Sequence, residues 1–102
     1  MNSETGASTD PAKRVYRRSR DVSFTRFGDE ALVVVPRGAW QLVLSDTGAR
    51  VLELLDGKED AGAIARTIAS EYEGAAPETV LGDVVEVLED LREKGAVELV
   101  EA

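Results

Sequence analysis

The chain has 102 residues, of which 12 are Lys or Arg and 20 are Asp or Glu, with no His and no Cys. It therefore offers no imidazole base, no thiolate nucleophile, no disulfide, and no zinc or iron–sulfur site of the usual ligand types. Any catalysis would rest on carboxylates or hydroxyls, so we expect a single non-enzymatic domain that binds no metal and no cofactor.

The first 20 residues differ in composition from the rest of the chain. They are rich in Ser, Thr, Gly and charge, follow neither a strand nor a helix period, and have a net charge of +3, whereas residues 21–102 carry −11. We predict a disordered basic tail over residues 1–20 and one folded domain over residues 21–102.

The acidic domain would repel the phosphates of nucleic acids, because specific DNA binding normally needs a basic face. The sequence has no apolar run of about 18 residues and no apolar segment typical of a signal peptide. We therefore expect a cytoplasmic protein that binds neither nucleic acid nor membrane.

Alternating apolar residues predict three strands between residues 22 and 44. A turn at Gly28-Asp29 separates the first two strands, and a loop at residues 36–38 separates the second from the third. In the third strand, residues 39–44, one face holds Trp40, Leu42 and Leu44. We expect Trp40 to be a core residue, because a lone aromatic among aliphatics usually anchors a core.

The apolar period then becomes helical. We predict helices over residues 46–56, 60–74 and 77–94, the first capped by Ser45 or Asp46, and expect the second to bury Ile64, Ile68 and Tyr72. In the third helix Leu81, Val84, Leu88 and Leu91 would fill the core, which leaves Val80 and Val87 as surplus apolar residues. The predicted fold is α+β, a three-stranded antiparallel meander followed by three helices.

No glycine-rich phosphate loop is present, and the paired carboxylates Glu59-Asp60 and Glu89-Asp90 fall on expected solvated faces. The sequence therefore favours a binding module. Two consecutive hairpins leave the third strand at an edge of the sheet, where an extended peptide could pair beside the surplus apolar residues of the third helix. The alternative is that residues 97–100 cover this strand and that Val80 and Val87 complete the core.

Residues 31–99 resemble the PqqD-like family, the peptide-recognition domains of ribosomal peptide natural-product biosynthesis. The matching residues are Leu44, Thr47-Gly48, Leu54-Leu55-Asp56-Gly57, Ile64, Ala65, Tyr72, Asp83-Val84, Leu88, Leu91, Gly95 and Val97. Ser45 is a departure, because the family usually has Asn at this position.

The resemblance implies a winged helix-turn-helix-like fold that adds the leader of a precursor peptide as a strand, against the third helix. It also implies a partner, a modifying enzyme such as a radical S-adenosylmethionine maturase, to which the domain presents the precursor. Carried over to this chain, the implied peptide-binding residues are Ala39, Trp40, Gln41, Leu42, Val43, Leu44, Val80, Asp83, Val84 and Val87.

Two alternatives stay open. One is a winged helix-turn-helix DNA-binding regulator, although residues 77–94 hold six acidic residues against two basic ones, which is the wrong sign for phosphate. The other is a structural subunit of an enzyme assembly that has no peptide groove.

Overall fold

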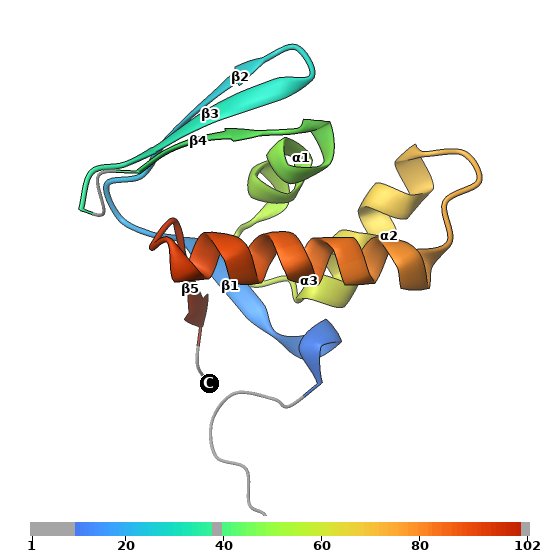
Figure 1. Cartoon of the computed structure of the whole chain (residues 1–102). Coiled ribbons are helices and arrows are strands. Elements are labelled where there is room, and N and C mark those ends of the chain that lie inside the picture. The colour runs from blue at the N-terminus through green and yellow to red at the C-terminus, as the bar shows by residue number, and fades with distance from the viewer. Residues whose placement is uncertain (1–9, 38–39, 101–102) are drawn as a thin grey trace, which may run out of the picture.

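The computed structural model describes residues 10–37 and 40–100. The elements are η1 (Pro11–Lys13), β1 (Val15–Arg18), β2 (Ser23–Phe27), β3 (Glu30–Val35), β4 (Trp40–Leu44), α1 (Asp46–Leu54), α2 (Ala61–Glu71), α3 (Pro77–Glu93) and β5 (Val97–Val100). Figure 1 shows the sheet of β2, β3 and β4 on one side of α1 and the long helix α3 on the other, with the β1–β5 ribbon behind and below α3.

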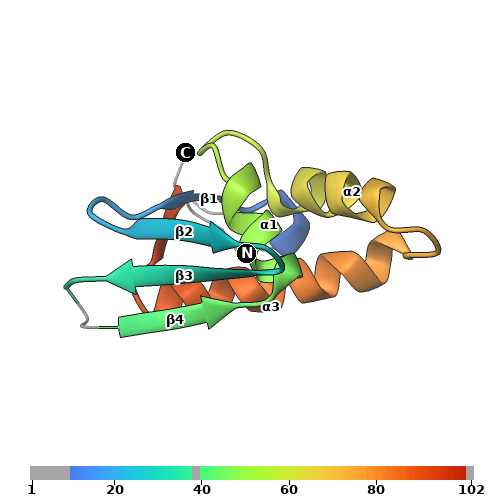
Figure 2. The same ribbon diagram turned by 90° about the horizontal axis from the view of Figure 1, so that it is seen from above.

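The three-stranded antiparallel sheet has the order β2-β3-β4, which confirms the predicted meander. The β2–β3 hairpin closes where Phe27 pairs with Glu30 around Gly28, whose φ of +57° suits the first position of a type II′ turn. β4 pairs with β3 along its whole length and has no partner on its other side within the described sheets (Figure 2). The predicted edge strand is therefore present.

The three predicted helices are confirmed, and their ends lie within about three residues of the predicted ones. α1 follows β4 directly and packs closely on it, because a Cβ atom added at Gly48 would lie 3.2 Å from Cβ of Leu44. α3 ends at Gly95, whose φ of +81° is a left-handed conformation that glycine adopts without strain.

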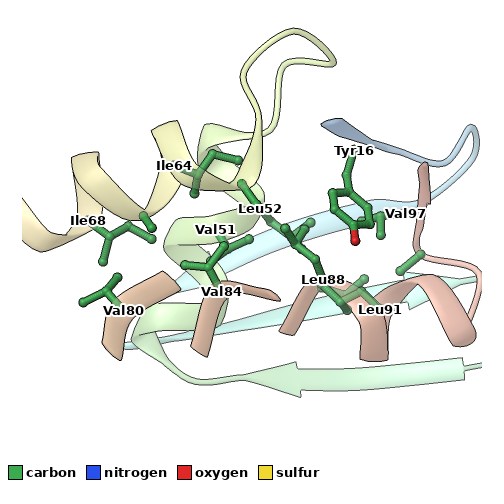
Figure 3. Packing of buried hydrophobic residues seen from close by; sticks show 14 of the residues in the cluster. Tyr16, Val51, Leu52, Ile64, Ile68, Val80, Val84, Leu88, Leu91 and Val97 are labelled. Carbon is green, nitrogen blue, oxygen red and sulfur yellow. The ribbon is translucent and has the colours of Figure 1, made fainter. Parts of the chain in front are cut away.

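The core contains a residue from the predicted tail. Tyr16 of β1 is 1% exposed and lies beside Leu88 of α3 and Val97 of β5 (Figure 3). β1 pairs with β5 in antiparallel register, with Tyr16 opposite Leu99. The prediction of a disordered tail is thus wrong for residues 10–20, while residues 1–9 lie outside the described residues.

The hydroxyl of Tyr16 joins β1 to α3. It donates a hydrogen bond of 2.5 Å to Oε2 of Glu89, which also lies 3.6 Å from Nη1 of Arg14. The guanidinium of Arg92 and the Tyr16 hydroxyl both donate to Glu89 and lower the pKa of its carboxyl, whereas burial raises the pKa of Tyr16. The N-terminal strand is therefore attached to the domain by an apolar ring and by a charged hydrogen bond.

Tyr72 was expected in the core and is instead 39% exposed. The helix α2 ends at Glu71, so Tyr72 leaves the helical stripe that buries Ile64 and Ile68. Its hydroxyl donates to Oδ2 of Asp46 at 2.5 Å, which ties the end of α2 to the start of α1.

We predict that Tyr16→Ala lowers the free energy of unfolding by about 3 to 5 kcal/mol, because a buried aromatic ring is removed from the core. Tyr16→Phe is the matched control, since it keeps the ring and removes only the hydrogen bond, at a cost of about 1 kcal/mol. Urea unfolding of the two variants measures both losses. Equal stability of Tyr16→Ala and the parent chain would contradict a core role for β1.

Acid should weaken the link between β1 and α3. Because the pKa of Glu89 is lowered from its ordinary 4.5, the ionised carboxylate stabilises the folded chain above that value, and this contribution is lost as the pH falls through the lowered pKa. We expect Glu89→Gln to be less stable than the parent at pH 7 and the difference to shrink on acidification. If the difference in the free energy of unfolding stayed constant down to the acid transition, the charge of Glu89 would make no contribution to stability.

Candidate functional site

The open edge of β4 presents backbone groups from alternate residues. In a two-residue hairpin the closing pair, here Phe27 and Glu30, is hydrogen-bonded, and hydrogen-bonded pairs alternate along antiparallel strands. Odd-numbered residues of β3 then bond to β4, where their partners are Trp40, Leu42 and Leu44. The N–H and C=O groups of Gln41 and Val43 therefore point to the unpaired side.

The side chains of β4 alternate between the two faces of the sheet, as predicted. Leu42 and Leu44 are half-buried against the core, while Gln41 and Val43 are exposed, Val43 to 67%. Trp40 was expected in the core and is instead 44% exposed, as the first residue of β4 and beside the C-terminal end of α3. Ala39 lies outside the described residues.

One flank of α3 faces this strand. Nζ of Lys94, the residue that caps the helix, lies 5.7 Å from the ring centroid of Trp40, within range of a cation–π contact. With 3.6 residues per turn, Asp83, Val87 and Asp90 share the flank of Lys94, and Asp90 also forms an ion pair of 2.6 Å with it. Val87 is half-buried there. An edge strand and an apolar residue flanked by carboxylates thus lie on the same side of the molecule.

The helix buries a different stripe from the one predicted. Val80 and Val84 belong to the core with Leu88 and Leu91, whereas Leu81 is only half-buried. The prediction that Val80 is a surplus residue is wrong, since the stripe centres on Val84 and includes the residue one turn before it. Val84 is fully buried, so it belongs to the core and presents no side-chain surface to a peptide.

The alternative in which residues 97–100 cover the third strand is excluded by the strand pairing. β5 is hydrogen-bonded to β1, in a separate two-stranded sheet. The pairing of Val15 with Val100 could not be predicted from local patterns, because 84 residues separate the two strand ends.

A hollow that the sequence did not predict opens at the Trp40 end of β4. It has a volume of about 1130 Å³ and lies between the β3–β4 hairpin, the C-terminal end of α3 and the β1–β5 ribbon. Basic side chains outnumber acidic ones in its lining, which contrasts with the acidic flank of α3. Clustering of arginines near Trp40 arises only in the folded chain, since the lining arginines come from three separate segments.

Metal and membrane sites find no support in the described part of the chain. Within residues 10–37 and 40–100, no group of three or more His, Cys, Asp or Glu side chains is placed to hold a metal ion. None of the helices described is both long enough and apolar enough to cross a membrane.

The family model for coenzyme PQQ synthesis protein D (PqqD) matches residues 30–97. The chain therefore belongs to the PqqD family, as its resemblance predicted. No curated protein matches the sequence.

Solved structures share the fold. The PqqD truncation of Methylobacterium extorquens PqqCD, described as a functional and stand-alone RiPP recognition element, is 28% identical with a TM-score of 0.68, over 82% of this chain and 88% of that chain. TbiB1 in complex with the TbiA(beta) leader peptide has a TM-score of 0.72 at 24% identity, over 80% of this chain and 94% of that one. Lasso peptide synthetase B1, complexed with its leader peptide, has a TM-score of 0.70 at 20% identity, over 81% and 96% of the two chains.

The register of β4 predicts which proline substitution the sheet tolerates. Val43→Pro removes an N–H that points away from β3, whereas Leu42→Pro removes a ladder hydrogen bond and leaves a carbonyl of β3 unpaired, at a cost of about 2 to 4 kcal/mol. Val43→Ala and Leu42→Ala are the matched controls for the lost side chains. In thermal unfolding, the loss of stability from the alanine variant to the proline variant should be larger at residue 42 than at residue 43. The reverse order would show that the register is wrong.

Proposed function

We propose that this chain binds the leader segment of a ribosomally made precursor peptide by adding it as a strand to β4, and presents the precursor to a modifying enzyme. The observation that carries the proposal is the open backbone edge at Gln41 and Val43, beside the flank of α3 that holds Val87, in a member of the PqqD family. Strand addition supplies affinity through main-chain hydrogen bonds and selectivity through alternate side chains.

The relatives support this assignment. One similar structure is described as a stand-alone RiPP recognition element, and two others hold leader peptides. The proposed site residues are Trp40, Gln41, Leu42, Val43 and Leu44 on the strand, with Asp83 and Val87 on the helix.

In this role the domain performs no chemistry. It binds and orients the precursor, and the covalent steps belong to a partner enzyme, which we propose to be a maturase such as a radical S-adenosylmethionine protein. The iron–sulfur clusters of such an enzyme would be its own, because this chain contains no Cys.

A DNA-binding role has no support from charge. The exposed side of α3 carries Glu78, Glu86 and Glu93, so a helix that would have to enter the major groove presents carboxylates to the phosphates.

A structural subunit without a groove differs from the proposed function in one measurable property, the binding of a leader peptide to β4.

We predict that a leader peptide encoded beside this gene binds β4 in extended form. Amide chemical shifts of Gln41, Val43 and residues 83–94 should change during titration. Val43→Pro should weaken binding at least about fivefold, because one intermolecular hydrogen bond is lost, whereas Val43→Ala keeps the N–H and should bind within about twofold of the parent.

A second pair of variants tests the helical wall. Val87→Asp places a charge on the flank that faces β4, and Val85→Asp places the same charge at a half-buried position on another flank. Only Val87→Asp should impair binding beyond its effect on stability. Shifts confined to α2, with residues 40–44 silent, would contradict the proposed function.

A further inference from the structure

The hollow beside Trp40 concentrates positive charge on an acidic protein. Among the residues that the structure describes, six basic side chains line it, against three acidic ones. The basic residues are Arg17, Arg18, Arg20, Arg37, Arg92 and Lys94. Since the net charge of the whole chain is −8, the remainder of the molecule is more acidic than the total indicates.

Four of these six cations already have partners. Arg17 pairs with Glu98 at 3.0 Å, and Arg18 donates two hydrogen bonds to the carbonyl oxygen of Leu52. On α3, Arg92 and Lys94 form ion pairs within the helix. These four contribute charge to the hollow, but their positions are explained by the folded chain itself.

Arg20 and Arg37 are different. Both side chains are exposed, and neither forms a hydrogen bond or an ion pair with any residue in the described ranges. They come from two turns that lie far apart in the sequence, the β1–β2 connection and the β3–β4 hairpin, yet they line the same hollow. Attraction to the C-terminal dipole of α3 explains Arg92 and Lys94. It does not explain two guanidinium groups presented from separate turns.

We propose that this hollow binds acidic side chains of the precursor peptide, at the end of the added strand that passes Trp40. The inference rests on the proposed function, since it concerns the same peptide. Guanidinium groups suit carboxylates, because their planar N–H donors match the two carboxylate oxygens. The volume of about 1130 Å³ exceeds what one side chain fills, so a short acidic stretch fits.

The charge pattern would also orient the peptide. Along α3, Asp83 and Asp90 repel acidic residues, whereas the hollow at the Trp40 end attracts them. All strand pairs in the described chain are antiparallel, and an antiparallel addition places the C-terminal side of the bound segment next to Trp40. The inferred substrate class is a leader whose acidic residues follow its strand-forming segment.

Trp40 is the only tryptophan of the chain, lines the hollow and is partly exposed, so its fluorescence reports directly on this site. The probe is a capped tetraglutamate peptide, with capped tetraglutamine as the uncharged comparison. We expect a saturable change of Trp40 emission with tetraglutamate, at a dissociation constant of roughly millimolar, that fades as added salt screens the charges. Tetraglutamine should produce no change.

The double variant Arg20→Gln, Arg37→Gln should weaken tetraglutamate binding about three- to tenfold. Arg66→Gln is the matched control, because Arg66 is exposed on α2 away from the hollow, and it should bind as the parent does. Unchanged thermal midpoints would show that the variants fold. The proposal would be overturned if the response did not saturate, or if tetraglutamine gave an equal response. It would also be overturned if inorganic phosphate, added to the same total concentration of negative charge, gave an equal response, or if Arg66→Gln weakened binding as much as the double variant.

Amide shifts with the leader peptide separate this inference from the proposed function. If the leader perturbs residues 40–44 while tetraglutamate leaves Trp40 unchanged, strand addition holds and the acidic subsite is wrong. If tetraglutamate binds but the leader leaves β4 silent, the anion site holds and the proposed function is wrong.

Discussion

Both the closed core and the open edge of β4 depend on the pairing of β1 with β5. It occupies the C-terminal strand, which therefore does not pair with β4, and it places Tyr16 against α3 as part of the core. Because the ribbon is a separate two-stranded sheet that lies behind and below α3 in Figure 1, it completes the core without covering β4. The ribbon also supplies part of the lining of the basic hollow, so β1 and β5 contribute directly to one of the two regions where a peptide is proposed to bind.

An unpaired strand is a hazard for any soluble protein, because it can pair with a second copy of itself. β4 has no charged residue, and its exposed Val43 gives no protection against such pairing. Two features limit self-association. The strand is only five residues long, and each copy carries a net charge of −8, so two copies that meet edge to edge repel one another. A peptide that lacks this negative charge along its strand-forming segment meets no such repulsion.

Local patterns in the sequence were sufficient for the meander and the three helices, because each depends on residues near one another in the chain. The features that were predicted wrongly, or not predicted, depend on residues far apart in the chain or on the ends of elements. Tyr16 becomes a core residue only through a strand more than 80 residues away, and the isolated four-residue segment around it has no period long enough to recognise. Trp40 and Tyr72 are apolar enough for a core, but Trp40 is the first residue of β4 and Tyr72 follows the last residue of α2, and both are partly exposed. The basic hollow collects residues from separate turns and a helix end, so no single stretch of sequence carries its signal.

Backbone pairing at β4 cannot by itself hold a peptide. Within residues 40–44, the part of this edge that the structure describes, Gln41 and Val43 turn their N–H and C=O groups outward. They allow four main-chain hydrogen bonds, which at about 1 kcal/mol each contribute about 4 kcal/mol. The loss of translational and rotational freedom on association costs about that much or more. Stable binding therefore requires side-chain contacts, and the described chain offers them at Val87, at the exposed ring of Trp40 and at the cations beyond it. Because main-chain bonds do not distinguish sequences, the same side chains that make the complex stable must also select the peptide.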